Sequence, residues 1–60
     1  MITVRKVHPS GALEVSAMVI GLSSHQVWLE RKAYIGYTKE EARKLFRVYL
    51  AEHGFGLVND

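Results

Sequence analysis

Apolar residues occupy every second position in two stretches of the N-terminal half, 2–5 and 13–19, which predicts β-strands. The segment 8–11 separates the two stretches and reads His-Pro-Ser-Gly, a turn sequence because proline presets a bend and glycine permits a positive φ. A third run, 26–35, is rich in β-branched and aromatic residues and follows a second turn at 21–24. The pattern therefore predicts three strands joined by two hairpins.

The C-terminal half changes to the period of an α-helix. Thr38 is followed three residues later by Glu41, the spacing of a capping box. His53 and Gly54 provide a helix end, because glycine adopts the left-handed conformation without penalty, and Phe55 is expected to pack back on the last turn. The spacing predicts a helix over about 38–53. Its apolar stripe is Ala42, Leu45, Phe46, Tyr49 and Leu50.

The two turns suggest how the strands pair. A four-residue loop in the first hairpin places Arg5 opposite Glu14, and a turn at 22–24 in the second places Met18 opposite Trp28. In this register Arg31 falls on the helix side, where its stem would lie on the core while the guanidinium reaches water. The sheet residues expected beneath the helix are Ile2, Val4, Leu13, Val15, Ala17, Val19, Val27, Leu29 and Ala33.

These elements predict one α+β domain over 1–60, a three-stranded antiparallel meander in the order 1-2-3 packed on one C-terminal helix (β-β-β-α). A 60-residue chain buries only about 60% of the surface of its unfolded form, which is close to the lower limit for folding alone. It contains no cysteine, so no disulfide can add stability. The apolar core must supply that stability.

The net charge of +2 is unevenly distributed. Residues 1–30 carry equal numbers of acidic and basic groups, whereas the excess of positive charge lies between Arg31 and Arg47. Lys39, Arg43 and Arg47 are spaced by four and form one basic edge of the predicted helix. This edge is either a solvated helix face or a binding surface for an anionic partner.

Residues for acid–base catalysis are scarce. The one aspartate is Asp60, at the chain end, and Glu40 and Glu41 are neighbours that point in different directions from the first helical turn. The three histidines, His8, His25 and His53, fall in the two turns and at the helix end, so at most two of them could share a metal. We therefore predict a chain that is not an enzyme and has no cofactor or metal site.

No targeting segment is recognisable. Arg5 and Lys6 precede an apolar stretch as in a signal peptide, but Pro9 and Glu14 interrupt it and no cleavage site follows. The longest uncharged run, 15–29, is too short and too polar for a membrane span. The absence of cysteine suits a reducing compartment. We expect a cytoplasmic protein with no membrane partner.

The junction Gly36–Phe46 resembles the sheet-to-helix junction of the three-strand-plus-helix DNA-binding domains of tyrosine integrases and plant ethylene-response factors. The residues that carry this resemblance are Gly36, Tyr37, Thr38, Glu41 and Ala42. Those families insert the outer sheet face into the DNA major groove, and the matching positions here are Arg5, Trp28 and Lys32. The helix start is also similar to the second helix of double-stranded-RNA-binding domains, and the whole looks like small bacterial proteins of unknown function.

Two functions stay open. We rank first a non-catalytic module that binds a protein partner, or a second copy of itself, through the outer sheet face. The residues expected to form that site are Arg5, Met18, Trp28, Lys32 and Tyr34. The alternative is nucleic-acid binding, which ranks second because carboxylates share the sheet face and would repel phosphates. Its expected contacts are Arg5, Trp28, Arg31, Lys32, Lys39 and Arg43.

Overall fold

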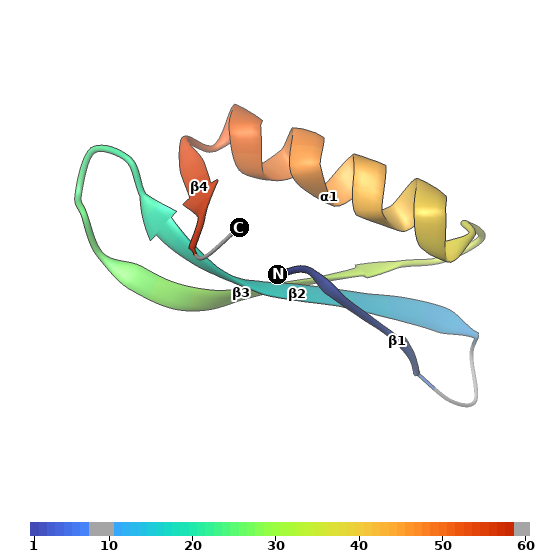
Figure 1. Ribbon diagram of the computed structural model, residues 1–60. Coiled ribbons are helices and arrows are strands. Elements are labelled where there is room, and N and C mark those ends of the chain that lie inside the picture. Colours follow the sequence, from blue (N-terminus) through green and yellow to red (C-terminus); the bar gives the residue numbers. More distant parts are fainter. Residues whose placement is uncertain (8–10, 59–60) are drawn as a thin grey trace.

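The computed structural model describes residues 1–7 and 11–58 and confirms the α+β class. One helix, α1, lies across one face of an antiparallel sheet, and none of the described elements covers the opposite face (Figure 1). The elements in chain order are β1 (Thr3–Val7), β2 (Ala12–Gly21), β3 (Val27–Tyr34), α1 (Lys39–Glu52) and β4 (Phe55–Leu57).

The sheet has the expected order β1-β2-β3 and one strand that the pattern did not predict. β4 pairs with the last residues of β2, on the edge where β1 pairs with the first half of that strand. Three residues with a glycine in the middle carry no recognisable period, so this strand forms because the helix end returns the chain to β2. β2 is therefore central, and β3 forms the other edge of the sheet.

The predicted caps of α1 are present. The Glu41 N–H donates to Thr38 Oγ1 at 3.1 Å, and the Thr38 N–H donates to Glu41 Oε1 at 2.9 Å, which completes the capping box. His53 is the C-cap and Gly54 follows with φ of 72°. This ending turns the chain toward β2 and brings Phe55 into β4.

The predicted register of the first hairpin is confirmed. Arg5 lies opposite Glu14 and Val4 opposite Val15, with 3.6 Å between Arg5 Nη2 and Glu14 Oε1. The expected turn at 8–11 falls mostly on residues 8–10, outside the described part of the chain.

The predicted register of the second hairpin is wrong by one residue. Met18 lies opposite Leu29, not Trp28, because the connecting loop contains four residues, 22–25. The fourth is His25, which adopts the left-handed region with φ of 60°. The Gly21 N–H then reaches the Gln26 carbonyl at 2.8 Å. A non-glycine residue at positive φ is uncommon, so the sequence favoured a three-residue turn at 22–24 over this four-residue loop.

The shift turns every side chain of β3 to the other face of the sheet. Trp28, Tyr34 and their even-numbered neighbours face the helix, whereas Val27 and Leu29 face away from it. An aromatic side chain buries about 150–250 Å², more than valine or leucine, so this register encloses the larger apolar surface. It also moves Arg31 from the helix side to the solvent side, so the charged guanidinium no longer has to lie over the apolar core.

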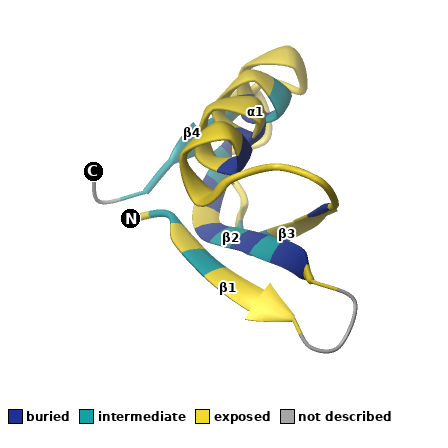
Figure 2. Cartoon of the chain, turned by 90° about the vertical axis from the view of Figure 1, so that its right-hand side faces the viewer, coloured by how far each residue is buried: buried dark blue, intermediate teal, exposed yellow. Residues whose placement is uncertain are grey.

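The core lies between β2 and one side of α1, while β1 is largely exposed (Figure 2). Phe46, Val15 and Val19 are its largest fully enclosed side chains. The buried cluster is Leu13, Val15, Ala17, Val19, Tyr34, Ala42, Phe46 and Leu50. Four residues expected in the core are exposed instead, three because of the register shift and one at the margin of the helix stripe: Val27, Leu29, Ala33 and Leu45.

Replacing His25 by glycine is expected to raise the free energy of unfolding by about 0.5–1 kcal/mol, because glycine adopts positive φ without a Cβ clash. Thermal unfolding should show a higher midpoint. Ser24→Gly in the same loop is the control and should lower the midpoint, since Ser24 has no positive φ to relieve. Equal destabilisation by both variants would contradict the four-residue loop.

Candidate functional site

The uncovered face of the sheet carries a group of apolar side chains at the β2–β3 hairpin end. Met18 pairs with Leu29, and Ile20 pairs with Val27. Met18, Leu29 and Val27 are 43%, 46% and 52% exposed, and Ile20 is half-buried. These four residues, called the outer patch below, are contiguous because directly opposed side chains on a sheet lie about 4.5–5.5 Å apart.

Charged and polar side chains continue the same face away from the hairpin end. Arg5 pairs with Glu14, and Ser16 lies opposite Arg31. Arg31 is exposed and forms no ion pair with the residues that the structure describes. The face therefore combines an aliphatic end with one unneutralised guanidinium.

A second group of side chains lies where β3 meets α1, on the helix side of the sheet. Glu30 is at its centre and joins the two elements. The Trp28 Nε1–H donates to Glu30 Oε1, and the Tyr49 hydroxyl donates to Glu30 Oε2, both at 2.6 Å. Such short bonds to a carboxylate are about twice as strong as neutral ones. Glu30 thus fixes an indole and a phenol at the open edge of the sheet.

Aromatic and cationic groups surround Glu30. The Trp28 ring meets Phe55 edge-on with centroids 4.8 Å apart, and the Tyr49 and His53 rings are 4.4 Å apart. Lys32 Nζ lies 4.8 Å from the centroid of the Tyr49 ring, within cation–π range. We call this group the seam cluster: Trp28, Glu30, Lys32, Tyr49, His53 and Phe55.

Hydrogen bonding sets the ionisation of the seam cluster. The Tyr49 hydroxyl, and then the Trp28 indole, lower the pKa of Glu30 below its ordinary value of 4.5 because both donate to the charged form. The same bond to Glu30 raises the pKa of Tyr49, whose proton it holds. Burial raises the pKa of Tyr34. Glu30 therefore stays an anion at neutral pH and does not suit the role of a general acid.

Two tyrosines on the helix side offer a matched pair of tests. The Tyr34 hydroxyl is buried and has no hydrogen-bond partner among the described residues, whereas the Tyr49 hydroxyl is bonded. Tyr34→Phe is expected to raise the free energy of unfolding by about 0.5–1 kcal/mol, and Tyr49→Phe to lower it by about 1–2 kcal/mol. Urea denaturation measures both, and the opposite order would contradict this arrangement.

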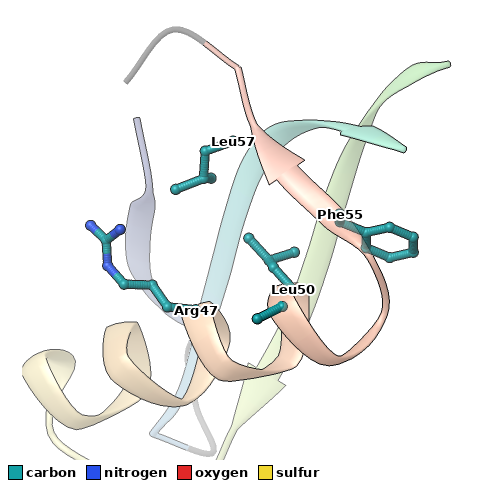
Figure 3. Close-up of a pocket in the computed structure, with 5 residues that line it drawn as sticks. Arg47, Leu50, Phe55 and Leu57 are labelled. Atoms are coloured by element: carbon teal, nitrogen blue, oxygen red, sulfur yellow. The ribbon is translucent and has the colours of Figure 1, made fainter. Parts of the chain in front are cut away.

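A shallow cavity of ≈ 180 Å³ lies between the end of α1 and β4 (Figure 3). Its lining is aliphatic and aromatic, with Arg47 extending along the rim. Pockets for small ligands usually measure about 300–1,000 Å³ and contain converging polar groups. The lining consists of Arg47, Leu50, Ala51, Phe55 and Leu57. No carboxylate or imidazole is among these residues.

The expected basic edge of α1 is exposed. Lys39, Arg43 and Arg47 follow one side of the helix at intervals of four and form no ion pair with the described residues. Of the histidines, His25 lies in the β2–β3 loop and His53 at the helix end, while His8 is outside the described residues. Within the described ranges no group of three histidine or acidic side chains has the geometry to hold a metal ion.

The residues predicted as a partner site do not share one surface. Arg5 and Met18 lie on the outer face as expected, but Trp28, Lys32 and Tyr34 face the helix because of the register shift. The predicted nucleic-acid residues divide among three places. Arg5 and Arg31 lie on the outer face, Trp28 and Lys32 in the seam cluster, and Lys39 and Arg43 on α1.

Sequence reasoning missed the exposure of Val27 and Leu29 and the central role of Glu30. Arg31 is the residue that could have indicated the correct register, because only the observed pairing places its charge on the outer face. Once that register is chosen, the even-numbered residues of β3 all turn toward the helix.

No protein-family model, curated protein or solved structure matches the chain. In the described part, no helix combines the length and the apolar composition that crossing a bilayer requires. The class of protein is thus defined by its own geometry: a small α+β chain with one helix-covered sheet face and one open face.

Proposed function

We propose that the chain is a non-catalytic interaction module that binds a protein partner through the outer patch. The observation that carries this proposal is the contiguous exposure of Met18, Val27 and Leu29 on a sheet face that no helix covers (Figure 1). A small domain near the limit of stability gains by enclosing such side chains, and exposed apolar groups gathered in one place are typical of interaction sites.

The surroundings of the outer patch indicate the chemistry of the partner. Arg5 is neutralised by Glu14, but Arg31 next to them has no ion pair among the described residues. Arg31 therefore lies beside a group of exposed apolar side chains. An arginine next to an apolar centre is a common arrangement in binding hot spots. The partner should present an aliphatic surface with a carboxylate at its border.

Catalysis receives less support. The cavity of ≈ 180 Å³ is small and lacks acidic side chains, and Glu30, the one carboxylate with a perturbed pKa among the described residues, is shifted toward permanent ionisation. General acids and bases in enzymes have the opposite property, a pKa close to the working pH.

Photo-crosslinking in the source cell tests the outer patch. A photoreactive residue at Met18 is expected to give one discrete adduct with another protein, and the matched position Val48, which is 54% exposed on α1, should not. Leu29→Lys should abolish the Met18 adduct without unfolding the chain, because Leu29 is already exposed. The proposal fails if both positions give the same adducts or if Leu29→Lys leaves the adduct unchanged.

Nucleic-acid binding is a second candidate because the cations on α1 have no ion pairs within the described residues. It predicts weak binding to duplex DNA or RNA that falls steeply with salt concentration. Arg43→Ala should reduce the affinity and flatten the salt dependence, while Lys32→Ala on the sheet edge should do neither. An NMR titration at low salt measures this. If no resonance of Lys39, Arg43 or Arg47 shifts, the second candidate is eliminated.

A further inference from the structure

β3 has a free edge. It pairs with β2, and no other described strand lies beside it. Gly21 and Gln26 are a hydrogen-bonded pair, called a narrow pair here, because the Gly21 N–H donates to the Gln26 carbonyl. Hydrogen-bonded and non-hydrogen-bonded pairs alternate along an antiparallel ladder, so the even-numbered residues of β3 direct their backbone groups toward β2. The odd-numbered residues must then direct theirs outward. The Val58 N–H bonded to the Met18 carbonyl, on the opposite edge of β2, agrees with this alternation.

This edge has none of the backbone features that block pairing with another strand. β3 is eight residues long, contains no proline, and pairs with β2 without an interruption in register. Natural edge strands are normally short, bulged, interrupted by proline, covered by another element, or supplied with charged side chains. β3 does carry the charges Glu30, Arg31 and Lys32. Glu30 and Lys32 have opposite signs and stand on the same face, two residues apart, so they can attract the same two residues of a second copy.

We propose that β3 pairs antiparallel with β3 of a second copy of this chain, about a two-fold axis at Arg31. The two sheets then become one continuous sheet with both helices on the same side. This interface is formed by the backbone edge of β3. It shares Val27 and Leu29 with the outer patch, whose other two residues, Met18 and Ile20, lie on β2. A two-fold arrangement requires a strand that is complementary to itself, and the sequence of β3 has this property on both sides of Arg31.

In the proposed register every helix-side pair is favourable. Glu30 lies opposite Lys32 of the second copy, twice by symmetry, and Trp28 lies opposite Tyr34. Such opposite-charge and aromatic pairs each contribute about 0.2–1 kcal/mol. Within its own chain Lys32 has no ion pair among the described residues. Glu30 uses one acceptor position on each oxygen for Trp28 and Tyr49, and each oxygen retains a second.

The outer-face pairs are apolar on both sides of the axis. Leu29 lies opposite Ala33 of the second copy, and Val27 lies opposite Ile35. Ile35 directly follows β3 and is 72% exposed in the single chain. The exception is Arg31, which faces its own symmetry mate across the axis, although both guanidinium groups remain in solvent.

Other registers are less favourable. A shift of the axis to Glu30 opposes two carboxylates, and a shift to Lys32 opposes two ammonium groups. Neither register contains an opposite-charge pair. The outward backbone groups of odd-numbered residues can bond only when odd-numbered residues of the two copies lie opposite each other. An axis placed between two residues would pair odd with even positions, so such registers are excluded.

The helices leave room for this pairing. The backbone of α1 lies closest to β2, β4 and β1, and the helix reaches β3 through the side chain of Tyr49, which bonds to Glu30. Neighbouring strands lie about 4.8 Å apart, so two helices centred near β2 of each copy stay separated by roughly three strand spacings. Helices in direct contact are about 8–10 Å apart. Seam-cluster side chains from both copies would occupy the gap.

Sedimentation equilibrium from low micromolar to near millimolar chain concentration tests the dimer. The wild type should associate, and Lys32→Glu should raise the dissociation constant about tenfold or more, because two attractive pairs become repulsive. Lys44→Glu, the same change of charge on exposed α1, should have no such effect. Lys32→Glu mixed with Glu30→Lys should form a heterodimer, since both charge pairs on the helix side are then complementary.

A cysteine variant tests the register independently, and the chain has no other cysteine. Arg31→Cys places two thiols across the axis, where Cα atoms of a narrow pair are about 5.5 Å apart, a distance that a disulfide spans. Ala33→Cys, the control, lies four positions out of register with its mate and should not crosslink. A wild type that is monomeric throughout, or equal crosslinking by both variants, would overturn the proposal.

Discussion

Phe46→Ala is expected to lower the free energy of unfolding by about 3–5 kcal/mol and to leave much of the chain unfolded at room temperature. Phe46 has no exposed surface, and with Val15 and Val19 it forms the fully enclosed centre between α1 and β2. A chain of this length cannot rearrange enough to fill the cavity left by a phenyl ring. Circular dichroism during urea titration measures the loss.

Val48→Ala on the same helix is the matched control. Val48 is 54% exposed, so its removal should change the free energy of unfolding by no more than about 0.5 kcal/mol. The two variants together decide whether stability depends on the helix face that covers β2. If Phe46→Ala lowered the free energy of unfolding no more than Val48→Ala does, the described packing of α1 on the sheet would be contradicted.

Glu30→Ala should cost about 2 kcal/mol at neutral pH, because it removes one carboxylate that accepts from both Trp28 and Tyr49. Solvent can replace part of these bonds, since the site is only partly buried. Trp28 fluorescence should change at the same time. In a double-mutant cycle with Tyr49→Phe, the two costs should not add, because both variants remove the same bond.

The contribution of Glu30 should depend on pH in a defined direction. Its pKa in the folded chain is below the ordinary value of 4.5, so the unfolded chain binds the proton more readily. The contribution of Glu30 to the free energy of unfolding is therefore complete above the ordinary pKa of 4.5 and is lost as the pH falls through the lower pKa of the folded chain. Between about pH 5 and pH 3 the wild type should lose more stability than Glu30→Ala. Parallel curves would contradict the assignment.

The elements with local signals could be predicted from sequence. The Thr38–Glu41 capping box and Gly54 define both helix ends, because capping depends on residues within one turn. The Arg5–Glu14 pair follows from the alternation of both strands in the first hairpin. β4 has no such signal, since its three residues are too few to show a period and their partners on β2 are distant in the sequence.

The second hairpin shows where local reasoning stops. Whether its loop ends at Ser24 or at His25 depends on one residue at positive φ, and that conformation is stabilised by the packing of the whole strand. The choice turned Trp28 from the open face to the helix side and replaced it with Leu29. The sequence predicted an open sheet face, but of the five residues assigned to it only Arg5 and Met18 lie there.

Cross-strand NOE measurements between α-protons test this register directly, and both proposed surfaces depend on it. Wide pairs in antiparallel sheets bring α-protons closest together. The observed pairing predicts strong α-proton contacts between Met18 and Leu29, and between Ile20 and Val27. A strong contact between Met18 and Trp28 would contradict it. That result would return Trp28 to the open face, and neither the outer patch nor the paired β3 edge would exist as described.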